Sequence, residues 1–318
     1  MADIVREVSV RTGARLHAGF YYAAGEWSVR WGSAGFYVDV PALEASFTLS
    51  SERCYEGPSE LRPYMERAAD VLGIGGFCAR VSSSLPLHSG FGVGTQVSLA
   101  SYRAFQLMIG HKPDPAPVAS ERLSMARVSG VGALLFDQGG FVMDAGMPGR
   151  PRTLLRLQVP EKWRFVIVVP DVGRGLDEQQ EDEVMGRLQW GASESLLASM
   201  AEGALRLASG IAREDIDDAA EGLRELQRAT GAFFARAQGG VYRGSLIDLA
   251  AEAWRHRMFL AQSSWGPAMY TLAEDEASAK GDADLLVETM REVGLKGRVL
   301  VVRPRNSAAE VSPVVLPD

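Results

Sequence analysis

Cysteine and histidine are scarce in this chain, which limits its metal and redox chemistry. The 318 residues include two cysteines and four histidines. None of them stands at the spacing of a zinc site. Cys54 and Cys78 are therefore expected to be free thiols in a reducing, cytoplasmic setting.

Long apolar runs and an excess of positive charge are lacking as well. No apolar run reaches the roughly 18 residues of a membrane span, and the acidic first ten residues lack the apolar core of a secretory signal. The formal net charge is -7, whereas nucleic-acid-binding proteins usually carry a basic excess. We therefore expect neither a membrane nor a nucleic acid as partner. A phosphate-bearing partner is expected to be a small molecule.

The most informative segment present is a glycine loop over residues 85–96. It reads L-P-L-H-S-G-F-G-V-G-T-Q, follows a strand pattern and precedes a helical pattern. A helix N-terminus offers unpaired backbone N–H groups and the positive end of the helix dipole, which suit a phosphate. The loop lacks the lysine of a P-loop and the spacing of a dinucleotide-binding fingerprint. It predicts a phosphate site of another kind.

Three other segments contain candidate functional side chains. Arg15 and His17 follow the first predicted strand and are expected on one face, where the arginine suits a phosphate or carboxylate and the histidine could donate a proton. The segment 127–132 predicts a flexible loop that a ligand can approach closely. The segment 262–267 combines polar side chains with a tryptophan, which suits a flat aromatic ligand. Each segment also has an ordinary structural alternative. Arg15 and His17 could lie on a solvent-facing strand edge, the segment 127–132 could be a turn, and the segment 262–267 could be a linker.

The apolar pattern predicts an α+β fold in two lobes. Residues 1–150 form the lobe with the glycine loop, and a change of composition near residue 150 separates them from a second lobe over residues 151–318. A continuous apolar run at 165–170 predicts a strand buried on both faces. Long helices are expected over 181–208 and 213–237.

Five motifs follow one another in an order that resembles a known superfamily. They are R-L-H-A-G-F from Arg15, the glycine loop, S-G-V-G-A-L-L-F-D-Q-G-G-F-V-M-D from Ser129, V-P-E-K-W-R-F-V-I-V-V-P from Val159 and Q-S-S-W-G-P-A-M-Y from Gln262. Together they resemble the GHMP kinase superfamily and, within it, the β-ribofuranosylaminobenzene 5′-phosphate synthases. The resemblance spans nearly the whole chain.

This resemblance implies both a fold and an activity. The fold would be GHMP-kinase-like, with an N-terminal lobe similar to ribosomal protein S5 and a ferredoxin-like C-terminal lobe. The activity would be the condensation of phosphoribosyl diphosphate with 4-aminobenzoate or 4-hydroxybenzoate, with release of diphosphate and carbon dioxide. Such a reaction belongs to the synthesis of tetrahydromethanopterin-type one-carbon carriers. Magnesium and a homodimer are further implications.

The residues favour the synthase over an ATP-dependent kinase. Kinases of the superfamily usually carry P-x-x-x-G-L-G-S-S-A, and this chain has Val93 and Gly94 at the two serine positions. Many also have an aspartate in S-G-x-D, where this chain has Gly132. A kinase without these groups would lose both metal positioning and proton acceptance.

Two departures from the synthases leave another alternative open. The synthases usually have serine at the position of Val93 and a basic R-G-R-R-S-G stretch at residues 125–130. A divergent paralogue or partner subunit that binds a phosphorylated metabolite without catalysis is therefore a second hypothesis.

The resemblance assigns roles to individual residues. Arg15, His17 and Asp144 would act in catalysis, and Asp137 would bind magnesium. The remaining candidates would bind the phosphorylated substrate or the aromatic acid: His88, Ser89, Gly90, Gly92, Gly94, Thr95, Gln96, Arg127, Ser129, Gly130, Gly132, Gln262, Ser263, Ser264 and Trp265.

Overall fold

A seven-stranded sheet forms the centre of the first lobe. The computed structural model describes residues 7–314 except 26–27, 126, 147–148, 174, 176–179, 181–182 and 185–191. The sheet has the order β11-β1-β2-β4-β3, and β5 and β6 extend it from β2. Its strands are β1 (Glu7–Gly25), β2 (Ser28–Leu49), β3 (Arg53–Glu56), β4 (Phe77–Ser84), β5 (Phe141–Asp144), β6 (Thr153–Leu157) and β11 (Glu310–Pro313).

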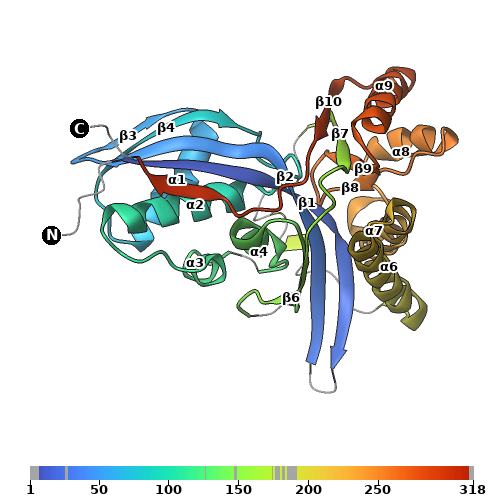
Figure 1. Ribbon diagram of the computed structural model, residues 1–318, viewed down its shortest axis with the longest axis horizontal. Coiled ribbons are helices and arrows are strands. Elements are labelled where there is room, and N and C mark those ends of the chain that lie inside the picture. Colours follow the sequence, from blue (N-terminus) through green and yellow to red (C-terminus); the bar gives the residue numbers. More distant parts are fainter. Residues whose placement is uncertain are drawn as a thin grey trace.

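Four helices lie together beside this sheet (Figure 1). They are α1 (Arg62–Val71), which follows the short 3-10 helix η1 (Ser59–Leu61), α2 (Val93–Met108), α3 (Ala116–Arg122) and α4 (Val131–Gln138). The central helix α2 packs on β1 and β2. Most of its residues are buried, so its N-terminus is held rigidly against the sheet.

The second lobe contains a four-stranded antiparallel sheet of order β10-β7-β9-β8. Its strand β7 is almost completely buried, which confirms the prediction from its apolar run. The elements are β7 (Arg164–Pro170), β8 (Ala261–Gln262), β9 (Met269–Ala273), β10 (Gly297–Val302), α6 (Glu194–Arg213), α7 (Ile216–Gln238), α8 (Leu246–Arg255) and α9 (Glu276–Glu292).

The two lobes are joined through β1 and β2, which are long strands of 19 and 22 residues. The two strands pair along nearly their whole length, and their far ends extend past the first lobe beside α6 and α7 (Figure 1). Arg15 and His17 therefore lie inside β1, and the prediction that they follow a strand is wrong. Irregularities in the pairing near Gly13 and Gly19 explain the error, because they interrupt the apolar alternation.

The two lobes are not separated cleanly at residue 150 of the chain. Strand β6 pairs with β5, and the C-terminal β11 pairs with β1, so segments beyond residue 150 belong to the first sheet. Helix α6 begins at Glu194, and most of the predicted helical segment before it lies outside the described residues. No helix in the described part of the chain is both long and apolar enough to cross a membrane.

The two cysteines form a disulfide, so the expectation of free thiols is wrong. Cys54 on β3 lies directly opposite Cys78 on the parallel strand β4, with 4.4 Å between the Cα atoms. The register of the two strands creates this proximity. Nothing in a separation of 24 residues indicates it.

Helices α6 and α7 pack closely through glycines, which generates a stability prediction. A Cβ at Gly222 of α7 would lie 2.2 Å from the backbone nitrogen of Leu207 on α6. We expect Gly222→Ala to lower the free energy of unfolding by roughly 1–3 kcal/mol, because the helices must separate. Urea denaturation measures the effect.

Gly281→Ala is the matched control. Gly281 lies within α9, and a Cβ there would meet no described atom within 4 Å. Alanine is the better helix former, so this variant should be more stable by up to about 1 kcal/mol. A similar gain at Gly222 would contradict the close helix packing.

Candidate functional site

The glycine loop forms the N-terminus of α2. Gly92 is the N-cap, with a φ of 68° in the left-handed region, and its carbonyl accepts the N–H of Gln96 at 3.2 Å. By the geometry of a helix start, the N–H groups of residues 93–95 have no carbonyl partner within the helix. The helix begins at Val93, inside the segment 85–96, so these groups belong to the glycine loop itself. This is a suitable position for an anion.

A cavity of about 110 Å³ lies against this helix start. The loop forms one side, and Arg15 of β1 and Tyr64 of α1 line it as well. The backbone N–H of Arg15 donates to the carbonyl of Phe91 at 2.9 Å, and its Nη1 donates to that of Gly90 at 3.4 Å. A cation and a helix N-terminus therefore line the same space. We call it the glycine-loop cavity.

The segment 262–267 packs directly on the glycine loop. The Ser263 hydroxyl donates to the carbonyl of Gly90 at 2.6 Å and accepts the N–H of His17 at 2.9 Å. The N–H of Ala268 donates to the carbonyl of Ser89 at 3.1 Å. Ser263 is completely buried, so it positions these segments and is not exposed to a ligand.

A second, smaller cavity of about 40 Å³ adjoins the first. Its aromatic side consists of Phe20, Phe234 and Trp265. The ring centroid of Phe234 lies 5.5 Å from that of Phe20 and 5.2 Å from that of Trp265. His17 also lines it, with its ring centroid 4.7 Å from that of Phe20. We call it the aromatic cavity. Ser264 and Trp265 line both cavities, so the two spaces meet at this pair.

The His17 imidazole is neutral at physiological pH. Burial of the ring and, to a lesser extent, the nearby Arg15 lower the pKa of His17 to about 3. Its Nε2 is buried and has no hydrogen-bond partner within the described part of the chain. The imidazolium form is therefore not populated near pH 7, which contradicts the expectation that His17 donates a proton there.

Asp144 is enclosed by hydrogen-bond donors and does not line either cavity. Its carboxylate accepts the N–H groups of Ser33, Gly130 and Gly146 and the hydroxyl of Ser33, at distances of 2.5–3.1 Å. Burial raises the pKa of Asp144, and these donors oppose the rise. The side chain ties the start of α4 to β2, and its predicted catalytic role stays a prediction.

Asp137 is not brought to the glycine loop. Its carboxylate pairs with Arg103 at 2.5 Å and accepts the N–H of Ala116 at 2.7 Å. Arg103 lies ten residues along α2 from Val93, which corresponds to about 15 Å. Asp137 is therefore engaged with Arg103 and Ala116 in this structure, and its role as a magnesium ligand stays a prediction.

The remaining candidates divide into lining and supporting residues. His88, Gly90, Gly92, Gly94, Thr95, Gln262, Ser264 and Trp265 line a cavity. Gln96 is buried and instead connects the carbonyl of Gly132 with the hydroxyl of Tyr37. A Cβ at Gly132 would lie 3.2 Å from Cγ2 of Thr95, so the two residues are close neighbours. Ser89, Arg127, Ser129 and Gly130 also lie outside both cavity linings.

Two curated enzymes are similar to this chain over nearly its full length. No family model matches it. The β-ribofuranosylphenol 5′-phosphate synthase of Methanothermobacter thermautotrophicus is 27% identical, over 96% of this chain and 99% of the relative. The enzyme of the same name from Archaeoglobus fulgidus is 26% identical, over 95% of this chain and 98% of the relative. The chain is thus similar to these synthases over nearly its whole length.

Solved structures show that this chain has the GHMP-kinase fold. Homoserine kinase from Cytophaga hutchinsonii superposes with a TM-score of 0.68 and 17% identity over 98% of both chains. Mevalonate diphosphate decarboxylase from Staphylococcus aureus superposes with a TM-score of 0.64 and 12% sequence identity. The superposition covers 96% of this chain and 98% of the decarboxylase. Both expectations drawn from the motifs, the synthase family and the two-lobed fold, are confirmed.

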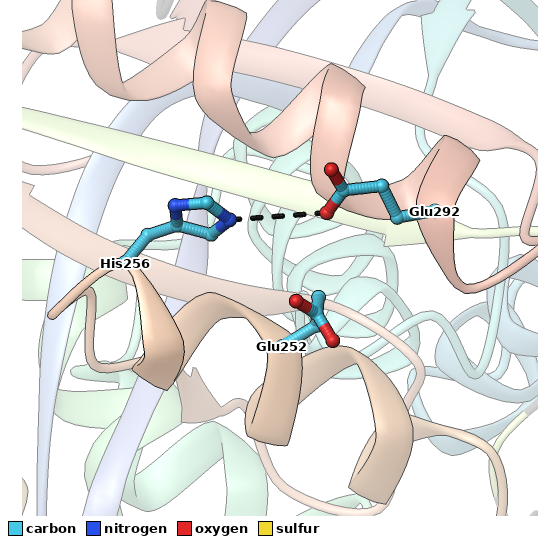
Figure 2. A group of neighbouring side chains, drawn as sticks. All are labelled: Glu252, His256 and Glu292. Atoms are coloured by element: carbon cyan, nitrogen blue, oxygen red, sulfur yellow. Dashed lines mark ion pairs between the residues drawn. The ribbon is translucent and has the colours of Figure 1, made fainter.

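The magnesium ion expected for the family has no obvious protein ligands here. Among the described residues that line the two cavities, none is an aspartate or glutamate, although Mg²⁺ usually binds one or two carboxylates. Figure 2 shows a different group, Glu252, His256 and Glu292, whose potential ligand atoms lie within 4.8 Å of one another. This group lines neither cavity, and Glu252 already pairs with Arg255 at 2.6 Å.

Sequence reasoning missed several residues of the site. Tyr64 and Phe234 come from helices far from the motifs, and no local signal identifies them. Gln227 could have been found, because it is a polar residue on the apolar face of α7. It is buried, and its Nε2 donates to the carbonyls of Ala18 and Gln262 at 2.9 Å and 3.1 Å.

Acidification should destabilise the wild-type protein more than a His17→Gln variant. The folded protein lowers the pKa of His17 from 6.5 to about 3. Its contribution to stability is therefore present above pH 6.5 and is lost as the pH falls toward 3. Between pH 7.5 and 5.5 this group alone should lower the free energy of unfolding by about 1.4 kcal/mol. Urea denaturation at both pH values measures this, and equal losses in the two proteins would contradict a buried neutral imidazole.

Proposed function

We propose that this chain transfers the phosphoribosyl group of phosphoribosyl diphosphate to an aromatic acid, with release of diphosphate and carbon dioxide. The observation that carries the proposal is the meeting of two cavities at Ser264 and Trp265, one suited to phosphate and one aromatic. The relatives are named for a ribofuranosylphenol product, which decarboxylative coupling of 4-hydroxybenzoate would yield. The reaction would serve methanopterin biosynthesis.

The glycine-loop cavity would hold the diphosphate. The N–H groups at the start of α2 and the guanidinium of Arg15 would take up the negative charge that develops on the leaving oxygen. Diphosphate is a stable leaving group, so the reaction needs no strong acid at this position. The ribose would lie near Ser264 and Trp265, between the two cavities.

The ring would approach from the side of the aromatic cavity. The ring carbon that bears the carboxylate forms a bond with the anomeric carbon, and the bond from that carbon to diphosphate breaks with its electron pair. The carboxylate is then lost as carbon dioxide, and the electrons of the broken carbon–carbon bond restore the aromatic ring. Nucleophile and leaving group must stand on opposite faces of the anomeric carbon, and the two adjoining cavities provide such a geometry.

An ATP-dependent kinase is less well supported. The fold alone connects this chain with homoserine kinase, at 17% identity. The kinase serines are replaced by Val93 and Gly94, and Gly132 stands where an aspartate would accept a proton. Such a site retains the phosphate-binding backbone and lacks the groups for phosphoryl transfer.

Magnesium, a homodimer and a cytoplasmic location stay predictions. In the absence of a lining carboxylate among the described residues, a magnesium ion would be bound mainly by diphosphate oxygens, with the Thr95 hydroxyl as an available neighbour. None of the steps above requires a metal held by the protein.

The purified protein should release diphosphate and carbon dioxide in equal amounts from phosphoribosyl diphosphate and 4-hydroxybenzoate or 4-aminobenzoate. A coupled diphosphate assay and carboxyl-labelled substrate measure the two products. Turnover of ATP with small alcohols, without either product, would support a kinase instead. Binding of phosphoribosyl diphosphate with no turnover would support a non-catalytic paralogue.

Gly92→Ala should weaken the binding of phosphoribosyl diphosphate. Gly92 has a φ of 68°, and a Cβ there would lie 3.1 Å from Nε of Arg15. The methyl group would crowd the guanidinium that lines the cavity, so we expect the Kd from calorimetry to rise about tenfold, or about 1.4 kcal/mol.

Gly110→Ala controls for backbone strain in this experiment. Gly110 has a φ of 72°, and a Cβ there would meet no described atom within 4 Å. Both variants should lose similar stability, because both place alanine in the left-handed region. An equal rise of Kd in the two variants would argue against a phosphate site at Gly92.

A further inference from the structure

His17 lines the aromatic cavity and carries a buried polar atom that has no partner among the described residues. Nε2 of His17 is unpaired within the described part of the chain, and the side chain is 3% exposed. Leaving such a group without a hydrogen bond is costly. Apolar rings of Phe20 and Phe234 stand beside it. A ligand group that hydrogen-bonds with Nε2 would remove this cost.

The size of the cavity limits what can enter. The aromatic cavity is the smaller of the two spaces, with about 40 Å³ against about 110 Å³ for the glycine-loop cavity. We therefore place only the para end of the ring in it. The rest of the ring would lie nearer to Ser264 and Trp265, which line both cavities.

The chemistry of the proposed reaction also places the para end of the ring in the aromatic cavity. The carbon that attacks the ribose bears the carboxylate, and the para substituent lies at the opposite end of the ring. If the carboxylate end faces the ribose and the glycine loop, the para substituent points away from them, toward the aromatic cavity.

We propose that Nε2 of His17 accepts a hydrogen bond from the para hydroxyl or amino group of the aromatic co-substrate and thereby selects for it. This inference rests on the proposed function. The para group donates electrons to the ring as the new carbon–carbon bond forms, so its O–H or N–H becomes a stronger donor. The hydrogen bond should therefore strengthen in the transition state.

The surroundings of His17 favour this group over a carboxylate. A carboxylate in the aromatic cavity would lose its hydration among apolar rings, and the lining contains no lysine or arginine. A neutral imidazole with its proton on Nδ1 can accept at Nε2. A hydroxyl or amino group supplies the donor without adding a buried charge.

The test compares 4-hydroxybenzoate with 4-methoxybenzoate, which has no para donor. The ratio of kcat/KM values for the two acids is measured in the wild type and in the variants His17→Phe and His17→Gln. The wild type should prefer 4-hydroxybenzoate by about tenfold or more, and His17→Phe should lose most of this preference. His17→Gln offers a carbonyl acceptor and should retain part of it. The KM for phosphoribosyl diphosphate should stay within about twofold.

The preference is a ratio within one protein, so a smaller folded fraction does not alter it. His111→Phe is the matched control, because His111 is exposed and lines neither cavity. An unchanged preference in His17→Phe, or a large rise in the KM for phosphoribosyl diphosphate, would overturn the assignment of His17. If the wild type turns over neither aromatic acid, the proposed function fails as well, which is a distinguishable outcome.

Discussion

The buried hydroxyl of Ser263 is the interaction on which the site depends. It bonds both the carbonyl of Gly90 and the N–H of His17, and so connects the glycine loop, strand β1 and the segment before β9. Ser263 is 173 residues from Gly90 and 246 residues from His17 in sequence. Because the phosphate-binding loop and the aromatic cavity are built on these same segments, their relative position is fixed before any ligand binds.

The arrangement explains how a kinase fold can support another chemistry. A helix N-terminus binds phosphate through its backbone, so this capacity persists when the serine and aspartate side chains of the kinases are replaced. The second lobe contributes Phe234 and Trp265, which provide an apolar surface next to the loop. In the proposed reaction, the diphosphate would leave as an attacking ring approaches from the other side. Backbone geometry supplies one half of the site, and aromatic packing supplies the other.

Much of this site could be predicted from local sequence patterns, and the rest depends on tertiary contacts. The glycine loop and the segment around Trp265 have a distinctive local composition, and the structure places both at the cavities. The hydrogen-bond partners of Asp137 and Asp144 could not be predicted, because an isolated carboxylate gives no sign of the donors that the fold will place around it. The same reason applies to the disulfide, which depends on strand register. The neutrality of His17 depends on burial by α7 and could not be read from β1 alone.

The most direct test of the account is a crystal structure of the protein with diphosphate and β-ribofuranosylphenol 5′-phosphate. The account predicts the diphosphate at the start of α2 beside Gly92 and Arg15, the ribose near Ser264, and the phenol oxygen within hydrogen-bond distance of Nε2 of His17. A phenol ring on the glycine-loop side of Trp265, or a phosphate in the aromatic cavity, would contradict it.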